Sequence, residues 1–212
     1  AHVNGSEVLA TGDSMLSIAT GTGGDPVLFN ARRYTGNATA RSITGFGFQP
    51  DLIWQKTRSA SQNHFLYDSV RGATTFVKSN ATSAQATGDG VGAFTNDGFK
   101  LGSGNDSNEN NQTFIAWAWK AGGAPSGDGK TMTDGTETTI STTLNVGTDS
   151  YTTASGTGIT AVRRSVNTTG GFSIVKWLNV GTGNDRAIPH GLGAVPDFIA
   201  IKPYSSAGAW MT

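Results

Sequence analysis

A glycine-containing segment that continues into an apolar run occurs twice in the chain. The first copy, residues 43–56, reads ITGFGFQPDLIWQK, and the second, residues 188–202, reads IPHGLGAVPDFIAIK. Both contain Gly-apolar-Gly, Pro-Asp, an apolar run and a lysine, and the second has one extra residue before Pro-Asp. Glycine permits close backbone packing, proline keeps the preceding residue extended, and aspartate can cap a turn. The repeat therefore predicts a turn that leads into a hydrophobic β-strand.

The composition around this repeat favours strands throughout. The 212 residues include 30 glycines, and threonine, serine and asparagine are abundant. Glycine breaks helices and threonine favours strands. The pair Asp97-Gly98 between strand-like residues is a hairpin signal. In residues 113–120, apolar side chains alternate on both faces, which indicates a central strand buried on both sides. We therefore predict an all-β fold, an antiparallel β-sandwich with the start of a second repeat.

The repeat and the low-complexity stretches suggest four segments. We expect an N-terminal β segment over residues 1–30 and a first β-sandwich repeat over 31–123. A Gly/Ser/Thr-rich linker with polar strands is expected over 124–169, since the linker-like stretch AGGAPSGDGK at 121–130 overlaps its start. The start of the second repeat is expected over 170–212. Because the second copy lacks the length that follows the first, we expect the native chain to continue past Thr212.

Charge and cysteine content argue against several classes of protein. The formal net charge is zero and 14% of residues are charged, so the clustered lysines and arginines of a nucleic-acid binder are absent. The chain has no cysteine, which excludes disulfides and thiolate sites. No apolar run approaches the roughly 18 to 20 residues that span a bilayer. We expect neither a nucleic-acid partner nor membrane insertion.

Candidate catalytic and metal-binding residues occur, but each has a structural explanation. A glycosidase uses two positioned carboxylates, and the candidates are Asp51, Asp68 and Asp97. Each lies in a turn-like context, where we expect capping or an ion pair such as Asp68 with Arg71. The histidines at 64 and 190 lack HExxH spacing and are not equivalent in the repeat. We therefore expect no enzyme and no catalytic residues.

The polar loop at residues 105–109 is the best candidate for a metal site. It offers hard oxygens of the kind that Ca²⁺ prefers, from Asn105, Asp106, Asn108 and Glu109. The EF-hand pattern is not met, because the required glycine and terminal glutamate are missing. We expect a solvated loop and no cofactor, with Ca²⁺ as the alternative.

The five tryptophans are the best candidates for contacts with a ligand. Most lie among apolar neighbours, where core packing is the simpler explanation. The candidates for glycan or partner contact are Trp54, Trp177 and Trp210. No other residues are candidates for a binding site.

Four segments, taken in order, resemble a known family. They read GFQPDLIWQK at 47–56, HFLYDSVRGA at 64–73, FTNDGFKLG at 94–102 and IAWAWKAGG at 115–123. Together they resemble an uncharacterised domain family of marine phage and prophage structural proteins. The likeness covers about residues 43–123 and, partially, 170–212. It implies a virion or tail-associated β-sandwich of jelly-roll or concanavalin-like type, and it implies no catalytic residues.

This resemblance sets the expected function. We expect a phage virion structural protein, a component of a tail fibre, spike or other appendage that acts by assembly and host-surface adhesion. Its expected partners are other copies of itself in a homo-oligomer, other virion proteins and a host surface glycan, and its expected location is the virion. The alternatives are a capsid decoration (cement) protein and a secreted carbohydrate-binding module.

Overall fold

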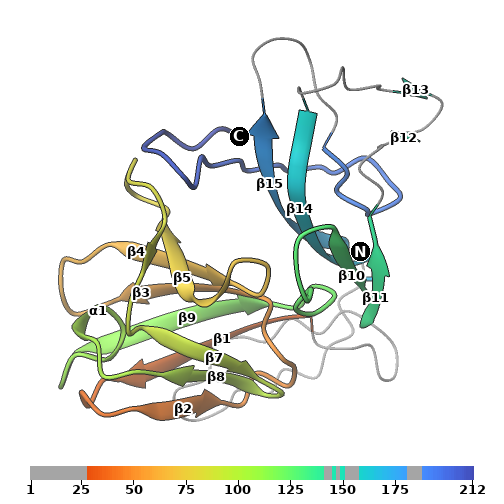
Figure 1. The fold of residues 1–212 in the computed structure, drawn as a ribbon. Helices are drawn as coiled ribbons and strands as arrows, with labels where there is room; N and C mark the ends of the chain where they lie inside the picture. The colour runs from red at the N-terminus through yellow and green to blue at the C-terminus, as the bar shows by residue number, and fades with distance from the viewer. Residues whose placement is uncertain (1–27, 141–144, 147–148, 151–157, 181–187) are drawn as a thin grey trace. The chain divides into compact units, whose positions relative to one another are not determined.

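The computed structural model describes residues 28–140, 145–146, 149–150, 158–180 and 188–212. Figure 1 shows that strands dominate, which confirms the all-β prediction. The chain forms two compact units. The first contains the described residues up to Lys120 together with Asp197–Thr212, and the second contains those within Ala121–Pro196. Most of the expected N-terminal β segment, 1–30, lies outside the described residues.

The first unit is an antiparallel β-sandwich. Its large sheet has the strand order β1-β9-β3-β4-β5-β6, and its small sheet has the order β2-β8-β7. The large-sheet strands are β1 (Phe29–Thr35), β9 (Thr113–Trp119), β3 (Leu52–Thr57), β4 (His64–Asp68), β5 (Gly72–Lys78) and β6 (Ala86–Thr87). The small-sheet strands are β2 (Arg41–Thr44), β8 (Gly98–Leu101) and β7 (Val91–Thr95).

The core of the sandwich is rich in aromatic rings. Strand alternation sends every second side chain of β1, β9, β3 and β4 between the two sheets. The largest fully buried members of this cluster are Phe46, Ile53, Phe65, Tyr67, Phe99 and Phe114. Burying each such side chain contributes roughly 1.5–3 kcal/mol to the stability of the first unit.

The first copy of the repeat forms the turn and strand that its sequence predicts. Gly45 and Gly47 adopt left-handed φ values of 92° and 80°, which glycine reaches without steric cost. Both donate their backbone N–H to the carboxylate of Asp97, at 2.8 and 2.7 Å. Phe46 between them is fully buried. The turn is therefore held by a carboxylate from the β7–β8 hairpin.

The second copy of the repeat does not form the expected strand at residues 197–202. Only an isolated bridge joins Ile201 to Met211. The apolar side chain of Phe198 is 74% exposed. The first copy is a strand because β9 and β4 flank β3 on both sides, and no described strand flanks 197–202 in this way.

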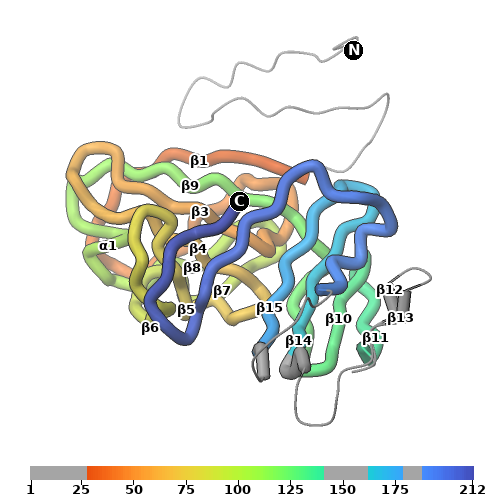
Figure 2. Tube along the Cα trace, turned by 90° about the horizontal axis from the view of Figure 1, so that it is seen from above, coloured from red at the N-terminus to blue at the C-terminus, as the bar shows by residue number. Residues whose placement is uncertain are grey.

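The C-terminal segment instead lies against the β5–β6 side of the large sheet. Trp210 Nε1 donates to the carbonyl of Lys78 at 3.1 Å. The amides of Gln85 and Gly208 bond to the carbonyls of Tyr204 and Thr82, at 2.9 and 2.8 Å. Figure 2 shows this segment as the dark blue tube beside β5 and β6.

The second unit contains a four-stranded sheet with the order β11-β10-β14-β15. Its strands are β10 (Lys130–Thr133), β11 (Thr136–Thr139), β14 (Gly158–Asn167) and β15 (Phe172–Val180), and a separate pair is formed by β12 (Asn145–Val146) and β13 (Asp149–Ser150). The β10–β14 pairing is parallel and the others are antiparallel. Strands expected in the linker thus share a sheet with the strand expected to start the second repeat.

Two local predictions were wrong. Residues 105–109 were expected to be a loop, but Asn105–Asn108 form the short helix α1, with Ser107 and Asn108 buried. The Asn108 side chain donates to the carbonyls of Thr39 and Gly102, both at 2.8 Å. Strand β9 was expected to be buried on both faces, but its outward face is buried only in part, since Ile115 is buried while Trp117 and Trp119 are half-buried.

Candidate functional site

The outer face of the large sheet combines aromatic and basic side chains. We define this outer face as the side chains of β1, β9, β3 and β4 that point away from the core. Strand registry aligns them in three rows. The rows are Phe29-Trp119-Leu52-Asp68, then Ala31-Trp117-Trp54-Leu66, then Arg33-Ile115-Lys56-His64. The first row is apolar and aromatic up to Asp68, which forms an ion pair with Arg71. The second row is apolar and aromatic throughout, and the third is rich in basic residues.

The aromatic rings of the outer face contact one another in pairs. Trp54 and Trp117 lie opposite each other, with ring centroids 5.8 Å apart and planes tilted by 59°. Phe29 and Trp119 lie 4.9 Å apart with a tilt of 48°. Trp54, Trp117 and Trp119 are all half-buried. The sheet therefore presents indole surface to the outside in a fixed arrangement.

His64 fixes the orientation of Trp54. The indole Nε1–H of Trp54 donates to Nδ1 of His64 at 3.3 Å. Desolvation by burial and, to a smaller extent, the positive charge of Lys56 lower the pKa of His64 below its usual 6.5. His64 is therefore neutral at pH 7, and its Nδ1 can accept the hydrogen bond.

A broad open basin of about 770 Å³ lies at the basic end of the outer face. Its lining residues are Arg33, Lys56, Thr57, Arg58, Ile115 and Trp117. None of these is acidic. Lys56 Nζ donates to the carbonyls of Thr57 and Ala60, at 2.5 and 3.4 Å. Arg58 is exposed, and neither it nor Lys56 forms a salt bridge in the part of the chain that the structure describes.

The structure separates the three tryptophans that the sequence singled out. Trp54 lies on the outer face, paired with Trp117. Trp210 lies in the C-terminal segment, where its ring is 6.0 Å from Lys202 Nζ. Trp177 lies in β15 of the second unit and is half-buried.

Sequence reasoning missed Trp117 and the basic residues beside it. Trp117 was assigned to the core because both faces of its strand are apolar. The signal that could have found it is strand alternation combined with pairing. If β3 and β9 are neighbours, then Trp54 and Trp117 share a face, and Lys56 lies one row further along.

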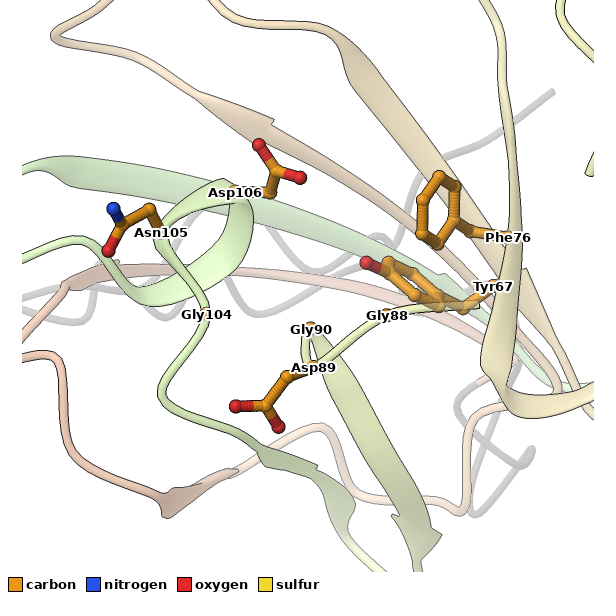
Figure 3. Close-up of a pocket in the computed structure, with 8 residues that line it drawn as sticks. All are labelled: Tyr67, Phe76, Gly88, Asp89, Gly90, Gly104, Asn105 and Asp106. Carbon is orange, nitrogen blue, oxygen red and sulfur yellow. The ribbon is translucent and has the colours of Figure 1, made fainter. Parts of the chain in front are cut away.

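A second, smaller pocket of about 200 Å³ lies beside α1 (Figure 3). Its lining residues are Tyr67, Phe76, Gly88, Asp89, Gly90, Gly104, Asn105 and Asp106. Asp89 accepts bonds from the backbone and hydroxyl of Ser103, at 2.9 and 2.8 Å, and these bonds lower its pKa. Burial raises the pKa of Tyr67 to about 12. At neutral pH the carboxylate is thus ionised and the phenol protonated.

Behind this pocket, buried polar groups tie α1 to the core. Ser107 Oγ donates to Gln55 Oε1 at 2.7 Å and lies 3.4 Å from Tyr67 Oη. The hydroxyl of Tyr34 donates to the Ser107 carbonyl at 2.8 Å. These bonds stabilise the position of α1 and account for the polar residues inside the sandwich.

The carboxylates that sequence analysis considered for catalysis have local partners. Asp68 forms the expected ion pair with Arg71 at 2.5 Å, and its Oδ1 accepts the N–H of Val70 and Arg71. Asp97 holds the Gly45–Gly47 turn. Asp51 is buried at the start of β3. These three side chains take part in turns and strand ends.

The oxygens considered for Ca²⁺ point to different partners. Asn108 Oδ1 accepts the N–H of Asn37 at 3.1 Å. Glu109 Oε2 accepts from Gln62 at 3.0 Å, and Asp106 lines the small pocket. Within the described ranges, no three His, Cys, Asp or Glu side chains gather as metal ligands. Among those same residues, no helix has the length and apolarity to cross a membrane.

Comparison with known proteins identifies one family. A sequence profile for a domain of unknown function (DUF7483) matches residues 25–162 and again residues 148–212. Each match contains one copy of the internal repeat. No curated protein and no solved structure gives a match. Since the two matched segments extend over most of its length, the chain belongs to the DUF7483 family.

Proposed function

We propose that this protein is a structural and adhesive module of a phage virion appendage, such as a tail fibre or spike. It acts by assembly and by binding to the host surface. The observation that carries the adhesive role is the outer face of the large sheet, where paired tryptophans adjoin a basin lined by three cations. The placement in a virion is supported by the order of sequence motifs, which resembles that of phage structural proteins.

The use of the carboxylates supports binding over catalysis. Acid–base chemistry on glycans needs two carboxylates that flank one bond. In this protein Asp68, Asp89 and Asp97 accept hydrogen bonds from nearby backbone groups or side chains. These carboxylates stabilise turns and loops, which is a common role of aspartate in β proteins.

Exposed apolar groups and a sheet edge support assembly. In the segments described, the large hydrophobic side chains that are exposed are Leu178, Val195, Phe198, Ile199 and Met211. Strand β11 forms the edge of its sheet, and all four of its residues are exposed. Edge strands present unpaired backbone groups that another chain can bond. Covering these groups in a homo-oligomer or against another virion protein removes the exposed apolar surface from water.

Locating the chain in purified particles tests this proposal. Antibody labelling of virions, or an image of the particle into which the first unit is fitted, should place the protein on an appendage in few copies. Many copies spread over the shell would instead indicate a capsid decoration protein. Absence from purified particles would contradict both.

A secreted carbohydrate-binding module is the second candidate function. The contact between Trp54 and Trp117 favours it, because paired indoles offer a surface on which sugar rings can stack. Such a module would be recovered from culture medium free of particles and would bind a polysaccharide on its own. Recovery only within particles would exclude it.

A further inference from the structure

We propose that the outer face of the large sheet binds an anionic polysaccharide of the polyuronate type. Sugar rings pack on Trp54 and Trp117, and carboxylate groups bind Lys56 and Arg58. This inference rests on the adhesive function proposed above and specifies the chemistry of its ligand.

The positive charge of the basin is the reason to expect an anionic ligand. Lys56 and Arg58 line a basin without acidic residues, and no ion pair neutralises either of them within the described segments. The chain as a whole has zero net charge, so this positive charge is a local feature. A guanidinium group binds a carboxylate through two parallel hydrogen bonds, and an ammonium group adds a compact charge. A sugar acid matches both groups.

The pair formed by Trp54 and Trp117 is the reason to expect a carbohydrate. The C–H groups on one face of a pyranose ring are apolar and pack on the electron-rich face of an indole. Trp54 and Trp117 are half-buried, and Trp54 is bonded to His64. Their rings are therefore positioned before a ligand arrives, which reduces the entropic cost of binding.

The two copies of the repeat share the lysine but not the tryptophan. Ala200 occupies the position of Trp54 in the second copy, whereas the lysine is kept as Lys202. Both lysines donate to a carbonyl in the segment that follows, Lys56 to Ala60 and Lys202 to Gly208. The lysine thus has a structural role common to both copies, while the indole belongs to the first copy alone.

Single-stranded nucleic acid is the competing ligand, since it also combines stacking with negative charge. Its binding sites use a positive groove that follows the backbone past successive phosphates. In this sheet the cations gather at one end of the aromatic rows, around a single basin. The arrangement fits a ligand whose apolar rings and acidic groups lie close together, as in a polyuronate.

Isothermal titration of the full chain with polygalacturonate tests the proposal. The matched ligand is the same polymer with its carboxylates methyl-esterified, which keeps the sugar rings and removes the charge. We expect binding to polygalacturonate that weakens with added salt, because screening reduces the attraction. We expect binding to the ester to be at least tenfold weaker, about 1.4 kcal/mol.

Variants locate the site. Arg58→Gln, at an exposed side chain, should reduce the affinity about tenfold, or about 1.4 kcal/mol, since it removes a charged donor of two parallel hydrogen bonds to a carboxylate. Trp117→Ala should reduce it at least as much, and Trp117→Phe should retain part of the binding. Lys100→Gln, an exposed cation of β8, and Trp177→Ala in the second unit are matched controls that should leave the affinity unchanged.

Several results would overturn the inference. These are no binding to polygalacturonate, equal binding to the ester, tighter binding to a single-stranded oligonucleotide, or loss of affinity in Lys100→Gln equal to that in Arg58→Gln. If Trp117→Ala fails to fold, Arg58→Gln decides the outcome. If the chain is found on the appendage but does not bind polyuronate, the proposed ligand is wrong and the virion function stands. If the chain binds polyuronate but is absent from particles, the virion function is wrong and the proposed ligand stands.

Discussion

The indole N–H of Trp54 points at Nδ1 of His64, at a distance of 3.3 Å, from the neighbouring strand of the large sheet. This bond couples a titratable group to an aromatic ring that we place in the binding site. It also joins the aromatic rows of the outer face to the basic row.

His64 should titrate below 6.5, because desolvation and then Lys56 lower its pKa. Between the pKa of His64 in the folded chain and its value of about 6.5 in the unfolded chain, the unfolded chain binds more protons than the folded one. The free energy of unfolding should therefore fall as the pH drops through this range. An NMR titration of the His64 ring measures the midpoint. Lys56→Met should raise the midpoint of His64, because it removes the neighbouring positive charge. A wild-type midpoint at or above 6.5 would show that burial and Lys56 do not lower the pKa of His64.

Asp97→Asn should destabilise the first unit by about 1–3 kcal/mol, since one of the two accepting oxygens is replaced by an NH2 group that cannot accept a hydrogen bond. Those bonds hold the N–H groups of Gly45 and Gly47. Asparagine is well tolerated before Gly98 in a hairpin turn, so the change tests the two bonds of the carboxylate and not the conformation of the hairpin. Urea unfolding gives the measurement, and Asp197→Asn, at an exposed aspartate, is the control. Equal stability of the two variants would show that the carboxylate does not hold the turn.

Gly90→Ala should cost about 1–3 kcal/mol through overpacking. A Cβ at this position would lie 2.1 Å from Tyr67 Oη and 2.6 Å from Ser107 Oγ. Gly92→Ala, two residues further along the chain in β7, is the matched control because the nearest neighbour of its Cβ, the Lys100 carbonyl oxygen, would be 3.9 Å away. Thermal unfolding of both variants compares them. A Gly90 variant as stable as the Gly92 variant would contradict the packing of Tyr67 beside α1.

Trp210→Ala should loosen the C-terminal segment without unfolding the sandwich. It removes the bond from Nε1 to the Lys78 carbonyl. Hydrogen exchange at the amides of Gln85 and Gly208 should then speed up, while exchange at Ile53 in the core stays slow. Phe198→Ala, on the same segment, is the control. Unchanged exchange at Gln85 would mean that Trp210 does not hold the segment.

Much of the fold could be predicted from local sequence. The glycines of the repeat predicted a special turn, and the alternation in residues 113–119 predicted a central strand. The carboxylate that holds the turn could not be predicted, because Asp97 lies 50 residues from Gly47 in sequence. Helix α1 was missed for a similar reason, since its buried Asn108 bonds to the carbonyls of two other segments.

The outer face could be predicted only in part. Trp54 was singled out from its sequence, but the pairing of β3 with β9 determines that Trp117 is its neighbour. A one-residue shift of this register would move Trp117 into the core and Ala116 or Ala118 to the outside. Periodicity describes each strand separately and contains no information on register. The cations of the basin were missed because their grouping also depends on that pairing.

The five tryptophans allow one direct test of the binding face. Each has one indole N–H signal, which can be followed by NMR while polygalacturonate fragments are added to the full chain. The indole signals of Trp54, Trp117 and Trp119 should shift in a saturable manner, while those of Trp177 and Trp210 stay in place. Shifts confined to Trp177 or Trp210, or no shift in any of the five, would contradict a binding site on the outer face.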